Sequence, residues 1–308
     1  MLKAFYHPGF AADIGQHVMP MHKFGMVAEA LRAFDWVELV EPAPVTEVDL
    51  LRVHVPEYVN AVRTGAPRLL AESQKFPWSP ALWPSVLLTG GGCLAAGRDA
   101  LLTGASAALV SGFHHSHASN GEGFCTFNGL VVAAEAMRVA GEICRVAILD
   151  MDLHYGNGTA RLAATRPWVT AVSVYGNDYC NNTPFRDVSV KRHVDGENHI
   201  SFPLPSGCDR ADMLRIMEEA LPFVLTGGRP DLILYQAGAD PFREDPYSPL
   251  DLDYEDLKAR DRMIFAFARQ HSIPIAWVLA GGYTPDTSCV VRVHVNTFMA
   301  WHDVFEPE

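Results

Sequence analysis

Two adjacent histidines, His114 and His115, lie in the segment GFHHSHASNGEGFCTFN at residues 112–128, directly after a run of small and apolar residues. A loop with a purely structural role has little use for neighbouring imidazoles. Because imidazole titrates near neutral pH, a catalytic site that moves protons does have a use for them. The pair therefore indicates general acid–base chemistry.

A second polar segment, ILDMDLHYGNGT at 148–159, contains Asp152 and His154. These residues are two apart, so their side chains point to the same face of an extended chain. Together with Asp240, from the later segment QAGADPFREDP, they offer two carboxylates and one imidazole. Such a set leaves open positions for water and substrate, as in catalytic zinc sites, and it also suits Fe²⁺ or another divalent ion.

Other polar residues could complete a hydrolytic site around such an ion. The ion would lower the pKa of bound water towards about 7, and a nearby imidazole could act as general base. Tyr283, in the segment LAGGY, could stabilise a tetrahedral oxyanion. Asp150 and Asn157 could accept hydrogen bonds from histidine N–H groups and fix their tautomers.

Taken singly, several of these residues could have purely structural roles. Asp240 could cap a helix, and Tyr283 could simply pack in the core. Cys125 is expected to be a small buried hydrophobe rather than a nucleophile. Nine other histidines, among them His117 and His294, are assigned to structural or surface positions. The functional interpretation depends on the polar clusters occurring together.

The elements that must position these residues are short apolar runs that alternate with segments of helical period. The expected strands are 107–113, 145–152, 169–175, 231–238 and 274–282, with a first strand in LKAFYH. The expected helices are 25–34, 93–104, 129–142, 211–225 and 254–271. This alternation predicts a mostly parallel sheet with helices on both faces, whose ligands bind beyond the carboxyl ends of the strands. Each polar cluster lies at such an end.

The composition is that of a globular protein, with 308 residues, 49% hydrophobic and 19% charged. No linker interrupts it, so we expect one domain over 1–308. The formal net charge of -12 argues against binding to nucleic acid or an anionic membrane surface. The six cysteines show no paired spacing. We find no signal peptide and no apolar run that approaches the about 20 residues of a bilayer span. These features predict a cytoplasmic protein.

Together the four motifs resemble the zinc-dependent histone deacetylase family, whose fold is shared with arginase. The segments match the family's His-His and Gly-Phe-Cys, Asp-x-Asp-x-His-x-Gly-x-Gly, Gly-x-Asp and Gly-Gly-Tyr motifs in order. HVMPMHKF, VHVPEYV and YGNDYCNNTPF look most like the class IV branch and its bacterial deacetylase-like amidohydrolases. The resemblance implies a three-layer α/β/α fold with a central, mostly parallel sheet of about eight strands.

Carried over position by position, the resemblance implies roles for individual residues. His115 would be the general base and then the acid, oriented by Asn157. His114 would be its electrostatic partner, held by Asp150. Tyr283 would polarise the substrate carbonyl. The zinc ligands would be Asp152, His154 and Asp240.

The resemblance also implies a substrate tunnel and a monovalent cation site. Gly123 and Phe124 would form one tunnel wall, with Gly282 beside them and Tyr179 or Phe185 opposite. Potassium or sodium would bind the backbone or hydroxyl oxygens of Asp150, Asp152, His154, Ser173 and Val174. Three positions depart from many relatives: Tyr155 replaces a second histidine, Asn157 an aspartate and Gly129 an acidic residue.

The expected reaction is hydrolysis of an amide between an acyl group, such as acetyl, and a primary amine. A small-molecule or peptide substrate such as an acyl-lysine or an acylpolyamine fits, and the residues do not choose between them. An arginase-type ureohydrolase, which uses two manganese ions, is a rival within this fold. A non-catalytic binder of acylated ligands is a rival from another class.

Overall fold

The computed structural model describes residues 1–15, 17–177 and 193–306. Its centre is one eight-stranded sheet in the order β2-β1-β3-β8-β7-β4-β5-β6, and neighbouring strands run parallel throughout. The predicted α/β architecture is confirmed. The strands are β1 (Leu2–Phe5), β2 (Val37–Val40), β3 (Ala105–Ser111), β4 (Val146–Asp150), β5 (Val169–Tyr175), β6 (His199–Pro203), β7 (Leu232–Ala237) and β8 (Ile275–Leu279).

All six expected strands are present, and the sequence missed β2 and β6. Every residue of β3, β4, β5, β7 and β8 is buried, which explains their continuous apolar sequences. The two missed strands form the edges of the sheet and are only partly buried. An edge strand has one neighbour and carries polar residues, so no long apolar run marks it.

The helices expected from the sequence correspond to α1 (Lys23–Leu31), α5 (Leu82–Thr103), α6 (Gly129–Val139), α8 (Arg210–Ala220) with a 3₁₀ turn at Leu221–Leu225, and α9 (Tyr254–Gln270). The sequence missed α2 (Glu47–Leu51), α3 (Pro56–Thr64), α4 (Arg68–Ala71), α7 (Asn157–Ala163) and α10 (Thr287–Phe305). α5 also begins well before the predicted residue 93. Its glycines, such as Gly91, allow a close approach, since a Cβ there would lie 2.0 Å from the Ala43 carbonyl oxygen.

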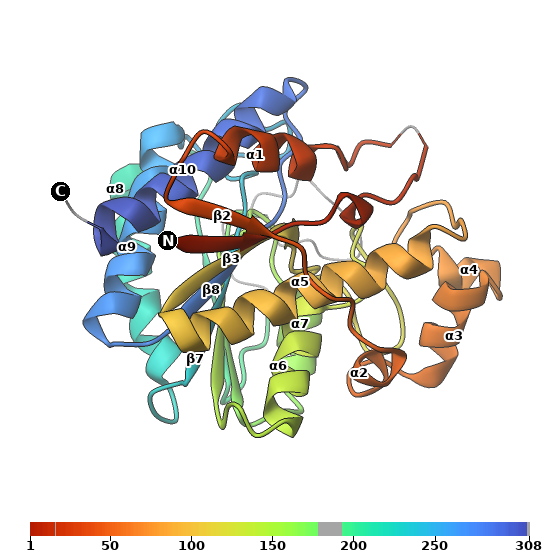
Figure 1. Ribbon diagram of the computed structural model, residues 1–308. Coiled ribbons are helices and arrows are strands. Elements are labelled where there is room, and N and C mark those ends of the chain that lie inside the picture. Colours follow the sequence, from red (N-terminus) through yellow and green to blue (C-terminus); the bar gives the residue numbers. More distant parts are fainter. Residues whose placement is uncertain (16, 178–192, 307–308) are drawn as a thin grey trace.

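The helices form a layer on each side of the sheet (Figure 1). α5 and α6 contact each other over one face, where α5 also packs on β3 and β8. On the other side α1 contacts α10, α10 contacts α9, and α9 contacts α8. No described helix combines the length and apolar character that a bilayer span requires.

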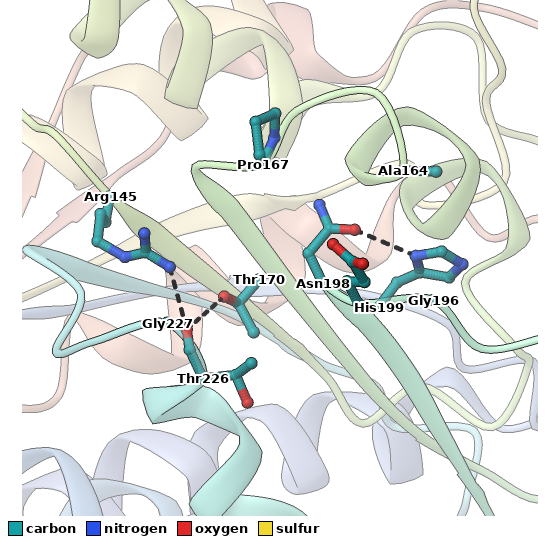
Figure 2. Close-up of a pocket in the computed structure, with 10 residues that line it drawn as sticks. Arg145, Ala164, Pro167, Thr170, Gly196, Asn198, His199, Thr226 and Gly227 are labelled. Atoms are coloured by element: carbon teal, nitrogen blue, oxygen red, sulfur yellow. Dashed lines mark hydrogen bonds between the residues drawn. The ribbon is translucent and has the colours of Figure 1, made fainter.

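A cleft of about 430 Å³ opens where β5 and β6 begin, at the amino end of the strands (Figure 2). Asn198, on its wall, holds the turn between α7 and β5. Its Nδ2 donates to the carbonyl oxygens of Ala163 (2.5 Å), Arg166 (3.0 Å) and Val169 (3.0 Å). The sequence-predicted site residues lie elsewhere, so we assign this cleft's polar groups to structure.

Replacing Asn198 with alanine should lower the free energy of unfolding by about 1 kcal/mol, because three carbonyl groups lose a side-chain donor. Urea denaturation would measure the change. Glu197→Ala, at the exposed neighbouring residue, is the control and should change stability by less than about 0.5 kcal/mol. Equal effects of the two substitutions would contradict the structural role.

Candidate active site

Four neighbouring strands carry the predicted site residues at their carboxyl ends. β3 leads into the two histidines, β8 into Tyr283, β7 into Asp240 and β4 into the Asp-x-Asp-x-His run. These strands are adjacent in the order β3-β8-β7-β4, although they are far apart in the sequence. The parallel arrangement therefore brings all four clusters to one edge of the sheet.

Asp152, His154 and Asp240 form a compact group of possible metal ligands. All three are buried, and one ligand atom from each lies within 4.8 Å of the others. His154 Nδ1 lies 3.1 Å from Asp152 Oδ1 and 3.1 Å from Asp240 Oδ2. Two carboxylates buried this close together require a compensating cation. The set of oxygen and imidazole ligands fits Zn²⁺ or Fe²⁺.

Backbone N–H groups hold the two carboxylates from behind. Asp240 Oδ1 accepts from the Leu153 N–H (2.9 Å), and Asp152 Oδ2 accepts from the Gly281 N–H (2.8 Å). A Cβ at residue 281 would lie 1.8 Å from Asp240 Oδ2, so only glycine fits there. The following Gly282 has a φ of 142°, a backbone conformation that favours glycine. The Gly-Gly pair thus lets the chain that follows β8 pass close to the ligand group.

A buried arginine that the sequence analysis missed joins the two loops that carry the ligands. Arg260 Nη1 donates to the carbonyl oxygens of Met151 (3.2 Å) and Gly238 (2.7 Å), which precede Asp152 and Asp240 in the chain. Its Nε donates to Asp261 at 2.8 Å. Arg260 therefore sets the spacing between the loops after β4 and β7.

The two adjacent histidines have different partners. His114 Nδ1 donates to Asp150 Oδ2 at 2.7 Å, and His115 Nδ1 lies 2.7 Å from Asn157 Oδ1. Their ring centroids are 4.0 Å apart. Burial opposes protonation of both rings, but the carboxylate beside His114 outweighs burial and raises its pKa. Burial and the neighbouring His114 hold the pKa of His115 well below its usual range.

Tyr283 faces this cluster from the end of β8. Its ring centroid lies 6.4 Å from that of His154, and its N–H donates to Asp245 Oδ2 at 2.7 Å. Burial and the nearby carboxylates raise the pKa of its phenol well above the usual value, so the hydroxyl keeps its proton. It can therefore donate a hydrogen bond near neutral pH.

Lys23 is a second buried cation that the sequence analysis missed. Its Nζ donates to the Ala280 carbonyl oxygen at 2.6 Å and lies 5.7 Å from the centroid of the Tyr283 ring. Burial lowers the pKa of Lys23 to about 8, although the site carboxylates oppose the shift. A lysine between apolar neighbours in MHKFGMV was the available signal.

Phe124, predicted as a tunnel wall, projects from a strained loop with a φ of 65°. Its ring contacts Phe76 (centroid distance 5.8 Å), His17 (4.8 Å) and Tyr283 (6.3 Å), and the first two contacts were not foreseen. A cavity of about 550 Å³, lined by residues between 11 and 22 and by 283–285 and 287, lies against the same tyrosine. The opposite wall, predicted at Tyr179 or Phe185, falls outside the described residues.

The residues predicted for a monovalent cation also lie together. Ser173 is paired with Asp150 across β5 and β4, and the next residue along β5 is Val174. The Ser173 hydroxyl is buried and has no hydrogen-bond partner among the described residues. A buried hydroxyl without a protein partner suits an ion ligand.

The structure shows the surroundings of Tyr155, Gly129 and Asn157, the three positions noted above as different from many relatives. Tyr155 stacks on His193, with ring centroids 3.6 Å apart, and so takes no part in the ligand group. Gly129 begins α6 where a Cβ would lie 2.9 Å from Cys93 Sγ on α5. Asn157 is the first residue of α7, and its Oδ1 lies 2.7 Å from His115 Nδ1.

The profile of the histone deacetylase domain matches residues 17–298. The chain belongs to the histone deacetylase family. The resemblance expected from the motifs is therefore confirmed. This histone deacetylase family member is 30% identical to an uncharacterized protein of Picosynechococcus sp., covering 97% of the chain and 98% of that protein. It is 29% identical to a histone deacetylase-like amidohydrolase of Pseudomonas aeruginosa, covering 80% and 67% respectively.

The fold is also that of a solved structure. The acetylpolyamine aminohydrolase from Burkholderia pseudomallei superposes with a TM-score of 0.81 at 19% identity, covering 99% of each chain. The eight-stranded parallel sheet and its two helical layers are therefore the fold of this aminohydrolase structure.

Replacing Arg260 with methionine should lower the free energy of unfolding by about 3–5 kcal/mol, because buried Asp261 loses its cation and two loop carbonyls lose a donor. Chemical denaturation would measure the loss. The matched control is Arg262→Met, an exposed arginine on the same helix, which should change stability by about 0.5 kcal/mol or less. Similar losses would show that Arg260 does not hold the ligand loops.

Proposed function

We propose that this chain is a metal-dependent deacylase that hydrolyses the amide between an acyl group and a primary amine. One observation carries the proposal: the buried Asp152, His154 and Asp240 lie next to two histidines with opposite pKa shifts and a protonated tyrosine. The Pseudomonas relative is named an amidohydrolase, which agrees with amide hydrolysis.

The metal ligands in this proposal are Asp152, His154 and Asp240, with Zn²⁺ as the first candidate and Fe²⁺ as the second. When bound, such an ion lowers the pKa of water and polarises a carbonyl group. The orphaned Ser173 hydroxyl supports a separate K⁺ or Na⁺ site that includes the carbonyls of the Asp150–His154 run.

The protein groups supply the proton transfers. Neutral His115 accepts the proton of the attacking water at Nε2, since its Nδ1 faces Asn157. It then passes that proton to the leaving amine. His114, whose pKa the paired Asp150 carboxylate raises, is the electrostatic partner of His115 in this proposal. The Tyr283 hydroxyl donates to the carbonyl oxygen as negative charge develops there.

The substrate would enter beside Phe124, whose ring would line one side of the chain that carries the acylated amine. Gly123 and Gly282 would leave room for a narrow chain. The net charge of -12 favours a cationic amine such as an acylpolyamine over an anionic one. Acyl-lysine in a peptide fits the same chemistry.

The arrangement disfavours the ureohydrolase alternative, which needs further ligands for a second ion. Both oxygens of Asp245 already accept backbone N–H groups, from Tyr247 at 3.0 Å and from Tyr283 at 2.7 Å. Glu244 is exposed. Within residues 1–15, 17–177 and 193–306, the group around His154 is the one set of three candidate ligands.

The direct test is a panel of amides that varies acyl length and amine type, assayed with zinc- and iron-loaded protein. Tyr283→Phe should lower kcat about 10²- to 10³-fold with little change in KM, since the lost donor acts on the developing charge. Tyr254→Phe, which keeps a ring packed on Phe242, is the control and should retain activity. No turnover on any amide by the wild type would favour the non-catalytic binder.

Metal content separates the two hydrolase classes. The wild type should hold about one catalytic divalent ion per chain, whereas a ureohydrolase would hold about two. Asp240→Asn should weaken binding of that ion more than about 100-fold, because a charged ligand becomes a neutral amide. Elemental analysis after dialysis would measure it, with the exposed Asp251→Asn as control. Unchanged metal content in Asp240→Asn would exclude the proposed site.

A further inference from the structure

The Asn157 side chain lies between the proposed base and a carboxylate that has no assigned role. Its Oδ1 faces His115 Nδ1 at 2.7 Å, and its Nδ2 donates to Glu122 Oε2 at 2.7 Å. The same Glu122 oxygen lies 3.0 Å from His117 Nε2. A continuous hydrogen-bonded row therefore runs from His117 through Glu122 and Asn157 to His115.

The two ends of an asparagine amide have similar shapes but opposite hydrogen-bonding character. An aspartate at this position would offer an acceptor at either end, whereas the Asn157 amide must be turned the right way. In the reverse orientation its Oδ1 would face the Glu122 carboxylate, which places two acceptors together. Because an ionised carboxylate only accepts, Glu122 selects the orientation that turns Oδ1 towards His115.

The orientation of the amide decides the tautomer of the base. With Oδ1 as its neighbour, His115 Nδ1 must carry the proton, and the lone pair is left on Nε2. With the amide reversed, Nδ2 would face Nδ1 and favour the other tautomer, which has no lone pair on Nε2. A neutral imidazole in that form could not accept a proton at Nε2.

We propose that Glu122 is a positioning residue that acts through Asn157 to hold neutral His115 in the tautomer protonated at Nδ1. The loop is built to place it. Glu122 and Cys125 close a tight turn with two backbone hydrogen bonds, at 3.2 Å and 2.7 Å. The His117 ring contacts the Glu122 carboxylate on the side away from Asn157, and the His117 backbone N–H donates to the Asn120 carbonyl oxygen.

The carboxylate is also kept ionised where it stands. The Glu122 side chain is 16% exposed and the His117 side chain 20% exposed. Burial alone would raise the pKa of Glu122, but the hydrogen bonds from His117 and Asn157 lower it below the usual value. An aspartate at position 157 would hold a negative charge next to His115. In this chain that charge lies on Glu122 instead, and the Asn157 amide stands between it and His115.

A polarity swap tests the row. Asn157→Asp alone places two carboxylates against each other and should lower kcat about 100-fold, while Glu122→Gln alone loses the forced orientation and should lower it about 10-fold. In the double variant, the introduced amide at 122 can donate to the introduced carboxylate at 157, whose other oxygen still accepts from His115. We expect the double variant to recover kcat to within about 10-fold of the wild type. Losses that simply multiply would overturn the proposal.

The tautomer itself gives a readout that does not depend on turnover. In protein labelled with ¹⁵N-histidine, the His115 resonances, assigned by comparison with His115→Ala, should show protonated Nδ1 in the wild type. Glu122→Ala should shift them towards a mixture of tautomers. The exposed Glu197→Gln is the control and should leave them unchanged. Identical His115 spectra in wild type and folded Glu122→Ala would overturn the inference.

The inference rests on the proposed function for its catalytic meaning, but the two can fail separately. If the wild type hydrolyses no amide, the proposed function fails, and the ¹⁵N spectra still decide the role of Glu122. If the wild type is active and the swap does not rescue, the deacylase proposal stands and the positioning role falls. Thermal unfolding of each variant separates either result from a loss of fold.

Discussion

Burial of several carboxylates at one end of a parallel sheet is the constraint around which this molecule is organised. Asp150, Asp152, Asp240 and Asp245 are all buried there. Taking even one charge out of water is expensive unless it is paired. Burial and the neighbouring Asp152 raise the pKa of Asp240, which marks this group as one that a cation would stabilise. The other groups of the site stabilise these buried charges.

The chain itself supplies part of the compensation for the buried negative charges. His114 pairs with Asp150, Arg260 joins the two ligand loops, and Lys23 lies near the carboxylates from α1. Backbone N–H groups take up the oxygens that face away from the ligand group. What remains uncompensated lies between Asp152, His154 and Asp240, and this is where a divalent ion fits.

The parts that the sequence predicted are those with a local signal. Continuous apolar runs indicated the buried strands. The spacing of Asp152 and His154 directly after one of these strands indicated a possible ligand pair. Lys23 stood in a mostly apolar segment, but neither its partner nor that of Arg260 could be predicted, because Ala280 and Gly238 lie in distant segments. The edge strands β2 and β6 were missed because exposure removes the apolar pattern.

Glu122 illustrates a different limit. The sequence showed that Asn157 replaces an aspartate, and hence that a charge was missing beside the base. It could not show where the charge had gone, since the carboxylate comes from another strand's loop and joins the row through an amide. The same short loop carries Phe124, so a single turn shapes both the substrate wall and the setting of the base.

The Lys23–Ala280 hydrogen bond has a consequence for how the molecule is made. The two residues are 257 positions apart, and β1, near the start of the chain, inserts between β2 and β3. During synthesis the ammonium group of Lys23 on α1 has no acceptor until the 257 positions that separate it from Ala280 have been made. Long-range contacts of this kind form slowly, so the pocket forms later than the helices whose contacts are local.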